Sequence, residues 1–256
     1  MKTFKSYTEI PASPQGAVVA MGNFDGVHLG HQSVIALARA VAAANNAPLG
    51  IVTFEPHPRQ LFAPDAPDFR LMNAETRAHR INKLGIDTLF ELPFNTALSQ
   101  LTAEAFARDV LATGLKVKHV VIGADFRFGK GRQGDADMLC KFGKEMGFGV
   151  TVAPLVSDDK GDYSSSAIRE ALSTGYPEDA ARILGHWHRI DGIVEKGDQR
   201  GRELGFPTAN ISLDGLHLPK FGVYAVFFDV LDGPHKGTYR GAASLGIRPT
   251  FGVNNP

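Results

Sequence analysis

The feature that most constrains the fold is a regular alternation of apolar, strand-like segments with helical segments between residues 17 and 184. Parallel strands need long crossover connections, and helices of this length provide them. The alternation therefore predicts an α/β fold with a doubly wound, Rossmann-like parallel sheet. The expected strands lie at 17–22, 49–55, 86–92, 118–123 and 149–156.

Helix start and stop signals agree with this division. Asn73 and Thr102 precede two helical stretches as N-caps, and Gly85 and Gly114 follow them as stops. In such a fold, ligands bind at the carboxyl ends of the strands, where the strand-to-helix loops gather. Periodicity and these signals together predict helices at 31–46, 73–85, 102–114, 135–147, 164–175 and 177–185.

The pattern changes near residue 185. From there the segments are short, bounded by turns and rich in strand-forming residues, with no helical period of useful length. We therefore expect two domains, the α/β domain over 1–184 and a smaller all-β, barrel-like domain over 185–256. About 70 residues are short for a closed barrel with its own core, so we expect this second domain to be incomplete.

Charge and cysteine content exclude several classes of protein. The chain has 27 Lys and Arg residues against 27 Asp and Glu residues, so nothing indicates a nucleic-acid partner. The single cysteine, Cys140, excludes an internal disulfide and is typical of a reducing compartment. Neither a signal peptide nor an apolar run of membrane length is found. We expect a cytoplasmic protein with small-molecule ligands, no membrane partner, and a monomeric or weakly homo-oligomeric state.

The stretch GNFDGVHLGHQ at 22–32 lies where the first predicted strand passes into the first helix. A helix N-terminus favours phosphate, because its N–H groups are unpaired and its dipole is positive there. His28 and His31 lie on one side of the first turn, where imidazoles can donate to phosphoryl oxygens as charge develops. Two surface histidines in a glycine-rich turn are the alternative, but the flanking strand and helix favour a phosphate site. The spacing matches neither a dinucleotide fingerprint nor a P-loop.

His28-Leu29-Gly30-His31 resembles the HxGH signature of the nucleotidyltransferase superfamily. The longer stretch resembles the FAD synthetase (FMN adenylyltransferase) module of bacterial bifunctional riboflavin kinase/FAD synthetases. The resemblance implies adenylyl transfer, in which the FMN phosphate attacks the α-phosphorus of ATP and gives FAD and pyrophosphate. Such chemistry depends on positioning and charge stabilisation, and Mg²⁺ accompanies ATP, held mostly by phosphates and water. Three further motifs agree, TFEPHPRQLF at 53–62, IGADFRFGKGRQGD at 122–135 and YSSSAIREAL at 163–172.

The resemblance implies three groups of site residues. The catalytic residues at the triphosphate would be His28, His31 and Arg169. ATP and phosphate binding would also use Gly22, Asn23, Phe24, Asp25, Gly30, Ser164, Ser165 and Ser166, with Asn23 and Asp25 positioning the nucleotide or magnesium. The flavin would contact His57, Asp125, Phe126 and Phe128.

Several of these residues also have a purely structural interpretation. The serines can cap a helix, which is compatible with phosphate binding. The stretch 125–128 can be a packed loop anchor, and Asp125 stands where many members of the family have Asn. His57, between two prolines, fits a rigid loop as well as a substrate contact.

The second domain resembles the riboflavin kinase module of the same proteins, which converts riboflavin and ATP to FMN and ADP. The resemblance implies that Gly201, Thr208 and Asn210 hold ATP, with Thr208 and Asn210 as magnesium ligands; two polar residues on a solvated strand face are the alternative. These kinases continue with further strands, a glutamate base and a C-terminal helix, whereas the sequence ends at Pro256. We therefore expect a truncated kinase module with doubtful kinase activity. The supporting motifs lie at 197–211, 218–226 and 241–252.

Two other functions compete with adenylyl transfer to FMN. Another HxGH transferase would act on a different phosphate, such as that of pantetheine or choline, but the joined kinase motifs argue against it. A non-catalytic flavin-binding or regulatory protein is the second alternative. The combination of HxGH with SSSxIR counts against it, because a binder needs no complete triphosphate site.

Overall fold

The computed structural model describes residues 1–195, 208–213 and 215–246. Its centre is a sheet in which every neighbouring pair of strands is parallel, in the order β1-β4-β3-β2-β5-β6. This confirms the predicted α/β fold and its five strands, and adds β1, a short edge strand that was not predicted. The strands are β1 (Lys2–Phe4), β2 (Val18–Met21), β3 (Leu49–Glu55), β4 (Thr88–Pro93), β5 (His119–Gly123) and β6 (Gly149–Ala153).

The predicted helices are present, with one difference in type. Asn73 and Thr102 accept backbone N–H bonds as the predicted N-caps. The predicted helix 102–114 begins as α5 (Ala103–Ala105) and continues as a π-helix, η1 (Phe106–Gly114), in which the N–H of Leu115 donates to the carbonyl of Val110. The other predicted helices are α1 (Leu29–Ala44), α3 (Ala74–Lys83), α6 (Ala136–Met146), α7 (Ser165–Thr174) and α8 (Pro177–Leu184).

Several short elements were not predicted. They are α2 (Pro58–Phe62), α4 (Thr96–Ser99), the 3₁₀ turn η2 (Lys130–Arg132) and the hairpin of β7 (Ser157–Asp158) with β8 (Gly161–Asp162). All of them lie in connections between the predicted elements. Among the residues described, no helix is long and apolar enough to cross a membrane.

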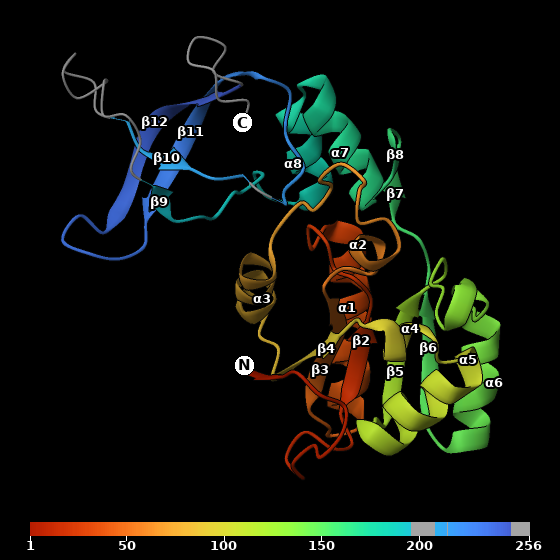
Figure 1. Ribbon diagram of the computed structural model, residues 1–256. Coiled ribbons are helices and arrows are strands. Elements are labelled where there is room, and N and C mark those ends of the chain that lie inside the picture. The colour runs from red at the N-terminus through yellow and green to blue at the C-terminus, as the bar shows by residue number, and fades with distance from the viewer. Residues whose placement is uncertain (196–207, 214, 247–256) are drawn as a thin grey trace.

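Helices cover both faces of the sheet (Figure 1). Successive residues of β2 face opposite layers, because side chains alternate along a strand. Val18 and Ala20 join the core with α1 and α3, whereas Val19 and Met21 join the core with η1 and α6. Burial on both faces explains why this strand is apolar at every position.

Helices α7 and α8 form a third, smaller core beyond the sheet. Ile168 and Leu172 of α7 pack with Ile183 and Leu184 of α8 and with Leu71, which precedes α3. The hydroxyl of Ser165, at the start of α7, donates to the carbonyl of Asp25 in the loop after β2. The third core therefore fixes the start of α7 against that loop.

Beyond residue 185, the described part consists of two antiparallel strand pairs. β9 (Val194–Glu195) pairs with β10 (Asn210–Ile211), and β11 (Gly222–Val230) pairs with β12 (Gly237–Leu245). Figure 1 shows the β11–β12 ribbon extending away from the α/β part of the chain. Apolar side chains on it are open to solvent, among them Val223 and Phe227. The all-β character is as expected, and within the described ranges these strands do not close a barrel.

Candidate active site

The candidate site lies where the winding of the sheet reverses. β2 has β3 on one side and β5 on the other, and the chain reaches them by crossovers in opposite directions. Loops that leave neighbouring strands in this way separate and open a crevice at the carboxyl ends of the strands. The loop after β2 ends at His28, the first residue of the HxGH motif, and the rest of the motif begins α1. The loop after β5 carries Asp125, Phe126 and Phe128.

His28 is the N-cap of α1. Its backbone is extended, and its ring Nδ1 accepts a hydrogen bond from the N–H of His31 at 3.3 Å. Because Nδ1 is the acceptor in the neutral ring, the proton must lie on Nε2. The cap therefore leaves His28 with one N–H donor beside the positive end of the α1 dipole.

The ring of His31 stacks on that of His28, with the ring centroids 3.7 Å apart. Burial, and to a smaller extent the charge of Arg169, lower the pKa of His28 from 6.5 to about 4. Burial also lowers the pKa of His31 well below its ordinary value, and the adjacent His28 acts in the same direction. Both imidazoles are therefore neutral at physiological pH.

Gly30 permits a close approach between α1 and the segment before α7. A Cβ at this position would lie 2.9 Å from the carbonyl oxygen of Tyr163 and 3.0 Å from Nδ1 of His28. Both distances are shorter than the contacts that Cβ atoms ordinarily make with neighbouring heavy atoms. Gly30 therefore lets the serine-rich start of α7 lie directly beside the capping histidine.

The remainder of the loop after β2 is held in an unusual conformation. Phe24 and Val27 are both buried and have positive φ angles of 52° and 45°. Such angles are rare for aromatic and β-branched residues and persist only where the surroundings enforce them. The carbonyl of Asn23 accepts from the hydroxyl of Thr53, and the N–H of Gly22 donates to the carbonyl of Val52. Contacts with β3 therefore fix the first half of the loop.

Asp25 and Arg169, separated by 144 residues in the chain, form a partly buried ion pair, in which Asp25 is the buried member. Nη2 of Arg169 lies 2.5 Å from Oδ2 of Asp25, and the other carboxylate oxygen accepts from the N–H of Leu71 at 2.9 Å. Burial raises the pKa of Asp25, and the charge of Arg169 opposes this effect. Nε of Arg169 donates to the carbonyl of Phe69 at 2.5 Å. The structure thus engages Asp25 and part of Arg169 with each other.

The three serines have different surroundings. Ser164 is the N-cap of α7 and accepts from the N–H of Ala167 at 3.2 Å. Ser165 donates to the carbonyl of Asp25 at 2.8 Å, and Ser166 is exposed. Ser164 therefore has the capping role, while Ser165 links α7 to the loop after β2.

The loop after β5, which carries the residues expected to contact the flavin, is anchored by its second aromatic residue. Phe128 is buried and packs on Phe106, and Phe126 stacks on Phe128 with centroids 5.9 Å apart. Phe126 is only partly buried, and Asp125 is exposed. The structural interpretation fits Phe128, whereas Phe126 and Asp125 remain open to a ligand.

His57 has a defined structural role in the segment after β3. It caps α2, with its Nδ1 accepting from the N–H of Arg59 and its own N–H donating to Oε1 of Gln60. Its ring meets that of Phe69 edge-on at 4.9 Å. Burial is the main cause that lowers its pKa to about 4.

A network of charges centred on the buried Arg77 lies beside the site and was not predicted from the sequence. Arg77 on α3 is 1% exposed and donates to Glu55 at 2.8 Å and to Glu91 at 3.1 Å. It also bonds the carbonyl of Asn23 at 3.4 Å. Arg70 holds Glu55 through two parallel bonds of 2.6 and 3.0 Å. One signal was available, because Glu55 and Glu91 are carboxylates at or near the ends of otherwise apolar strands.

The residues expected to bind ATP in the second domain are only partly described. Gly201 lies outside the described residues. Thr208 is exposed and precedes the strand, and Asn210 begins β10. Of the two residues expected on one strand face, only Asn210 therefore lies in a strand. Within the described ranges, no group of three or more His, Cys, Asp or Glu side chains is placed to hold a metal ion.

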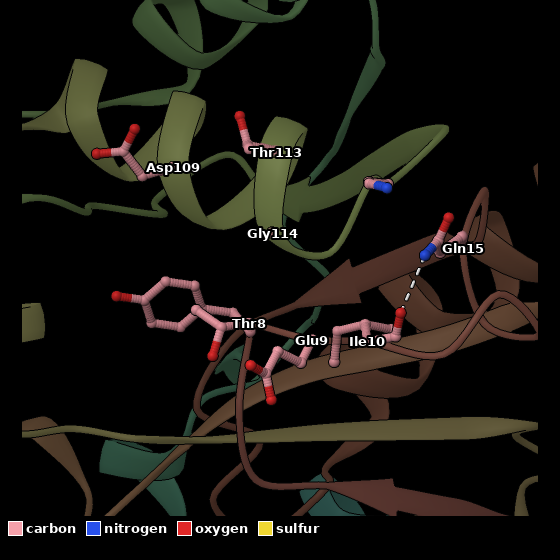
Figure 2. A pocket seen from close by; sticks show the side chains of 9 residues that line it. Thr8, Glu9, Ile10, Gln15, Asp109, Thr113 and Gly114 are labelled. Carbon is pink, nitrogen blue, oxygen red and sulfur yellow. Dashed lines mark hydrogen bonds between the residues drawn. The ribbon is translucent and has the colours of Figure 1, made fainter.

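A cavity of about 340 Å³ lies at the opposite, amino-terminal end of the sheet, before β2 and β5. Figure 2 shows Gln15 bonding the carbonyl of Ile10 at its wall, with Asp109 and Thr113 of η1 opposite. Gly114 lies close to the carbonyl of Tyr7, which a Cβ would approach to 2.4 Å. This cavity shares no residue with the predicted site.

Comparisons with known proteins place this geometry in a family. A family model for FAD synthetase matches residues 10–167, more than half of the chain, and a model for riboflavin kinase matches residues 184–256. The bifunctional riboflavin kinase/FMN adenylyltransferase of Escherichia coli (strain K12) is 38% identical over 251 residues. The chain belongs to this family. The alignment covers 98% of this chain and 79% of the Escherichia coli protein.

Two further proteins are similar to this chain over most of its length. The bifunctional riboflavin kinase/FMN adenylyltransferase of Pseudomonas fluorescens is 40% identical, covering 92% of this chain and 74% of the relative. A crystal structure described as a macrolide-efflux protein from Streptococcus pneumoniae is 32% identical, with a TM-score of 0.83. The match covers 97% of this chain and 80% of the Streptococcus pneumoniae chain. The fold of this family member is thus shared along nearly its whole length.

Proposed function

We propose that the first domain is an FMN adenylyltransferase, which transfers AMP from ATP to FMN and releases pyrophosphate. The observation that carries this proposal is the capping geometry of His28. A neutral imidazole fixed with its N–H on Nε2, at the start of α1 and at the switch point of the sheet, is suited to donate to a phosphate oxygen. Membership of the FAD synthetase family supplies the identity of the acceptor.

In the proposed reaction, a phosphate oxygen of FMN attacks the α-phosphorus of ATP. The bond from this phosphorus to the bridging oxygen breaks, and the electron pair leaves with pyrophosphate. Negative charge therefore grows on the leaving group, which His28 and the α1 dipole stabilise. The attacking phosphate is already ionised, so the step needs positioning and charge stabilisation and no side-chain nucleophile.

In this proposal Arg169 also stabilises the negative charge on the phosphates. Its Nε and Nη2 are taken by the carbonyl of Phe69 and the carboxylate of Asp25. Nη1 makes no hydrogen bond to a described residue, so we assign this atom to a phosphate oxygen. Asp25 then acts by fixing the guanidinium, because both of its carboxylate oxygens already accept hydrogen bonds.

Magnesium fits the proposed site as a companion of ATP. Asp25 is poorly suited to be a ligand, because its oxygens are occupied by Leu71 and Arg169. Mg²⁺ is commonly held by substrate phosphates, water and few protein groups. We therefore expect the triphosphate to bring the ion, which would neutralise charge on the phosphates.

The flavin would lie beside Phe126 and Asp125, with Phe128 anchoring the loop. Phe126 presents a partly exposed ring on a buried one, and a planar flavin ring can stack on such a surface. His57 and its neighbour Phe69 form the second aromatic surface in this proposal. Their capping and packing contacts would hold that surface rigid.

We further propose the division of the chain into domains at 1–184 and 185–256. Helix α8 ends at Leu184, and the match to the riboflavin kinase model begins at residue 184. In the second domain, Thr208 and Asn210 are proposed to bind Mg-ATP, as the kinase motif implies.

The test is FAD formation from FMN and Mg-ATP by the wild type and by His28→Ala. The wild type should form FAD, and His28→Ala should lower kcat by about 10²-fold, the typical effect of removing one donor to a developing charge. The affinity for FMN should change little, because His28 contacts the triphosphate. An unchanged kcat would show that His28 does not act as proposed.

A further inference from the structure

A four-residue strap, Asp68–Leu71, lies between the loop after β2 and α7. Two of its residues are bonded to the site. The N–H of Leu71 donates to the carboxylate of Asp25, and the carbonyl of Phe69 accepts from Nε of Arg169. The strap therefore fixes both members of the Asp25–Arg169 pair.

The other two strap residues are bonded to a segment of the second domain. The carboxylate of Asp68 accepts from the N–H of Gly215 at 3.0 Å. The carbonyl of Arg70 accepts from the N–H of His217 at 2.8 Å, and Arg70 forms a parallel bridge with Leu216, which is buried. Strap residues thus alternate between the predicted active site and this segment, as a strand between two partners does.

The same segment of the second domain also binds α7 directly. The N–H of Lys220 donates to the carbonyl of Leu172 at 2.9 Å. Figure 1 shows the chain between β10 and β11 passing beside α7. Gly175, at the end of α7, leaves space for the Lys220 side chain, since a Cβ there would lie 2.8 Å from its Cδ. Residues 215–220 therefore touch both elements that carry the contacts of Arg169.

His217 joins these contacts at Arg169 itself. Its Nε2 lies 3.0 Å from the carbonyl oxygen of Arg169 and 3.0 Å from the hydroxyl of Ser173, one turn later. A ring N–H between these two oxygens fixes the second half of α7 relative to the strap. Because the strap binds the Arg169 side chain and His217 binds its backbone, the arginine is held from both ends.

We propose that His217 is a positioning residue for adenylyl transfer, and that residues 215–220 of the second domain hold Arg169 and Asp25 in their active arrangement. This rests on the proposed function of the first domain. The second domain then contributes a structural part of the first domain's site. Loss of the His217 contact displaces Arg169 by a fraction of an ångström, and displacements of this kind slow such reactions by about tenfold or more.

Two amide substitutions of His217, which differ in side-chain length, test the proposed positioning role in the full chain. In His217→Gln the side-chain amide nitrogen takes the place of Nε2, whereas in His217→Asn it stops about where Nδ1 was. His235→Ala, an exposed histidine of the same domain, is the matched control. The measurements are kcat and KM for FAD formation, and hydrogen exchange at the amide of Leu71, all at a temperature where every variant is folded.

We expect His217→Asn to lower kcat about tenfold with KM for FMN within twofold, and to speed exchange at Leu71. His217→Gln should restore both, and His235→Ala should match the wild type. An unchanged kcat in His217→Asn would overturn the proposal, and so would a lower kcat with unchanged exchange at Leu71. If the wild type forms no FAD, the proposed function fails, while exchange at Leu71 still tests the support by residues 215–220.

Discussion

Acidification should destabilise this protein partly through His28, and the size of the effect follows from its burial. The folded protein holds the pKa of His28 at about 4, whereas the ordinary value is 6.5. Between these values the unfolded chain binds a proton that the folded protein does not. Stability must therefore fall as the pH drops through this window, and it is retained above it. From pH 7 to pH 5 the linkage relation gives a loss of about 2 kcal/mol from this group.

His28→Asn isolates this contribution. Asparagine is among the best N-capping residues, so the cap on α1 is kept while the titrating group is removed. Urea unfolding followed by circular dichroism at pH 7 and pH 5 gives the free energy of unfolding for both proteins. The variant should lose about 2 kcal/mol less than the wild type over this range. His79→Asn, which removes an exposed imidazole of α3, is the matched control. Equal losses in His28→Asn and the wild type would refute the assigned burial and neutrality of His28.

Two further substitutions test the support of the site. Arg77→Leu should cost about 3–5 kcal/mol in urea unfolding, because it leaves the buried Glu91 unpaired in the interior and removes one partner of the half-buried Glu55. Lys83→Leu, which changes an exposed residue of the same helix, should stay within about 0.5 kcal/mol. A small loss in Arg77→Leu would contradict a buried network. Gly30→Ala should lower FAD formation by about tenfold or more, since its Cβ would press on Nδ1 of His28, whereas Gly222→Ala, with its nearest contact at 3.8 Å, should not. Wild-type activity in Gly30→Ala would contradict the close approach.

Local signals explain what the sequence predicted well. The N-caps Asn73 and Thr102 satisfy N–H groups only three residues away, so their patterns are visible in a short window. β1 was missed because it has three residues and is defined by pairing with β4, more than 80 residues later. The π-helical form of 106–114 was missed because α- and π-helices use the same residue types and differ in bonding partner.

The features of the site likewise divide into those set by local sequence pattern and those set by long-range contacts. The position of the HxGH motif after β2, at the start of α1, follows from local pattern, and the structure has it there. The pairing of Asp25 with Arg169 joins residues 144 apart, and sequence reasoning directed each of them to the nucleotide or its metal ion. Ion pairs between residues so far apart produce no periodic pattern in the sequence. The capping role of His57 was also hidden, because histidine is not a usual N-cap.

Adenylyl transfer to FMN is tested most directly by a single assay of acceptors. The protein is incubated with Mg-ATP and FMN, phosphopantetheine or phosphocholine in turn, and adenylylated products and pyrophosphate are quantified. FMN should give FAD and pyrophosphate in equal amounts, and the other two phosphates should give neither. Pyrophosphate release with another acceptor and no FAD from FMN would contradict the proposed function.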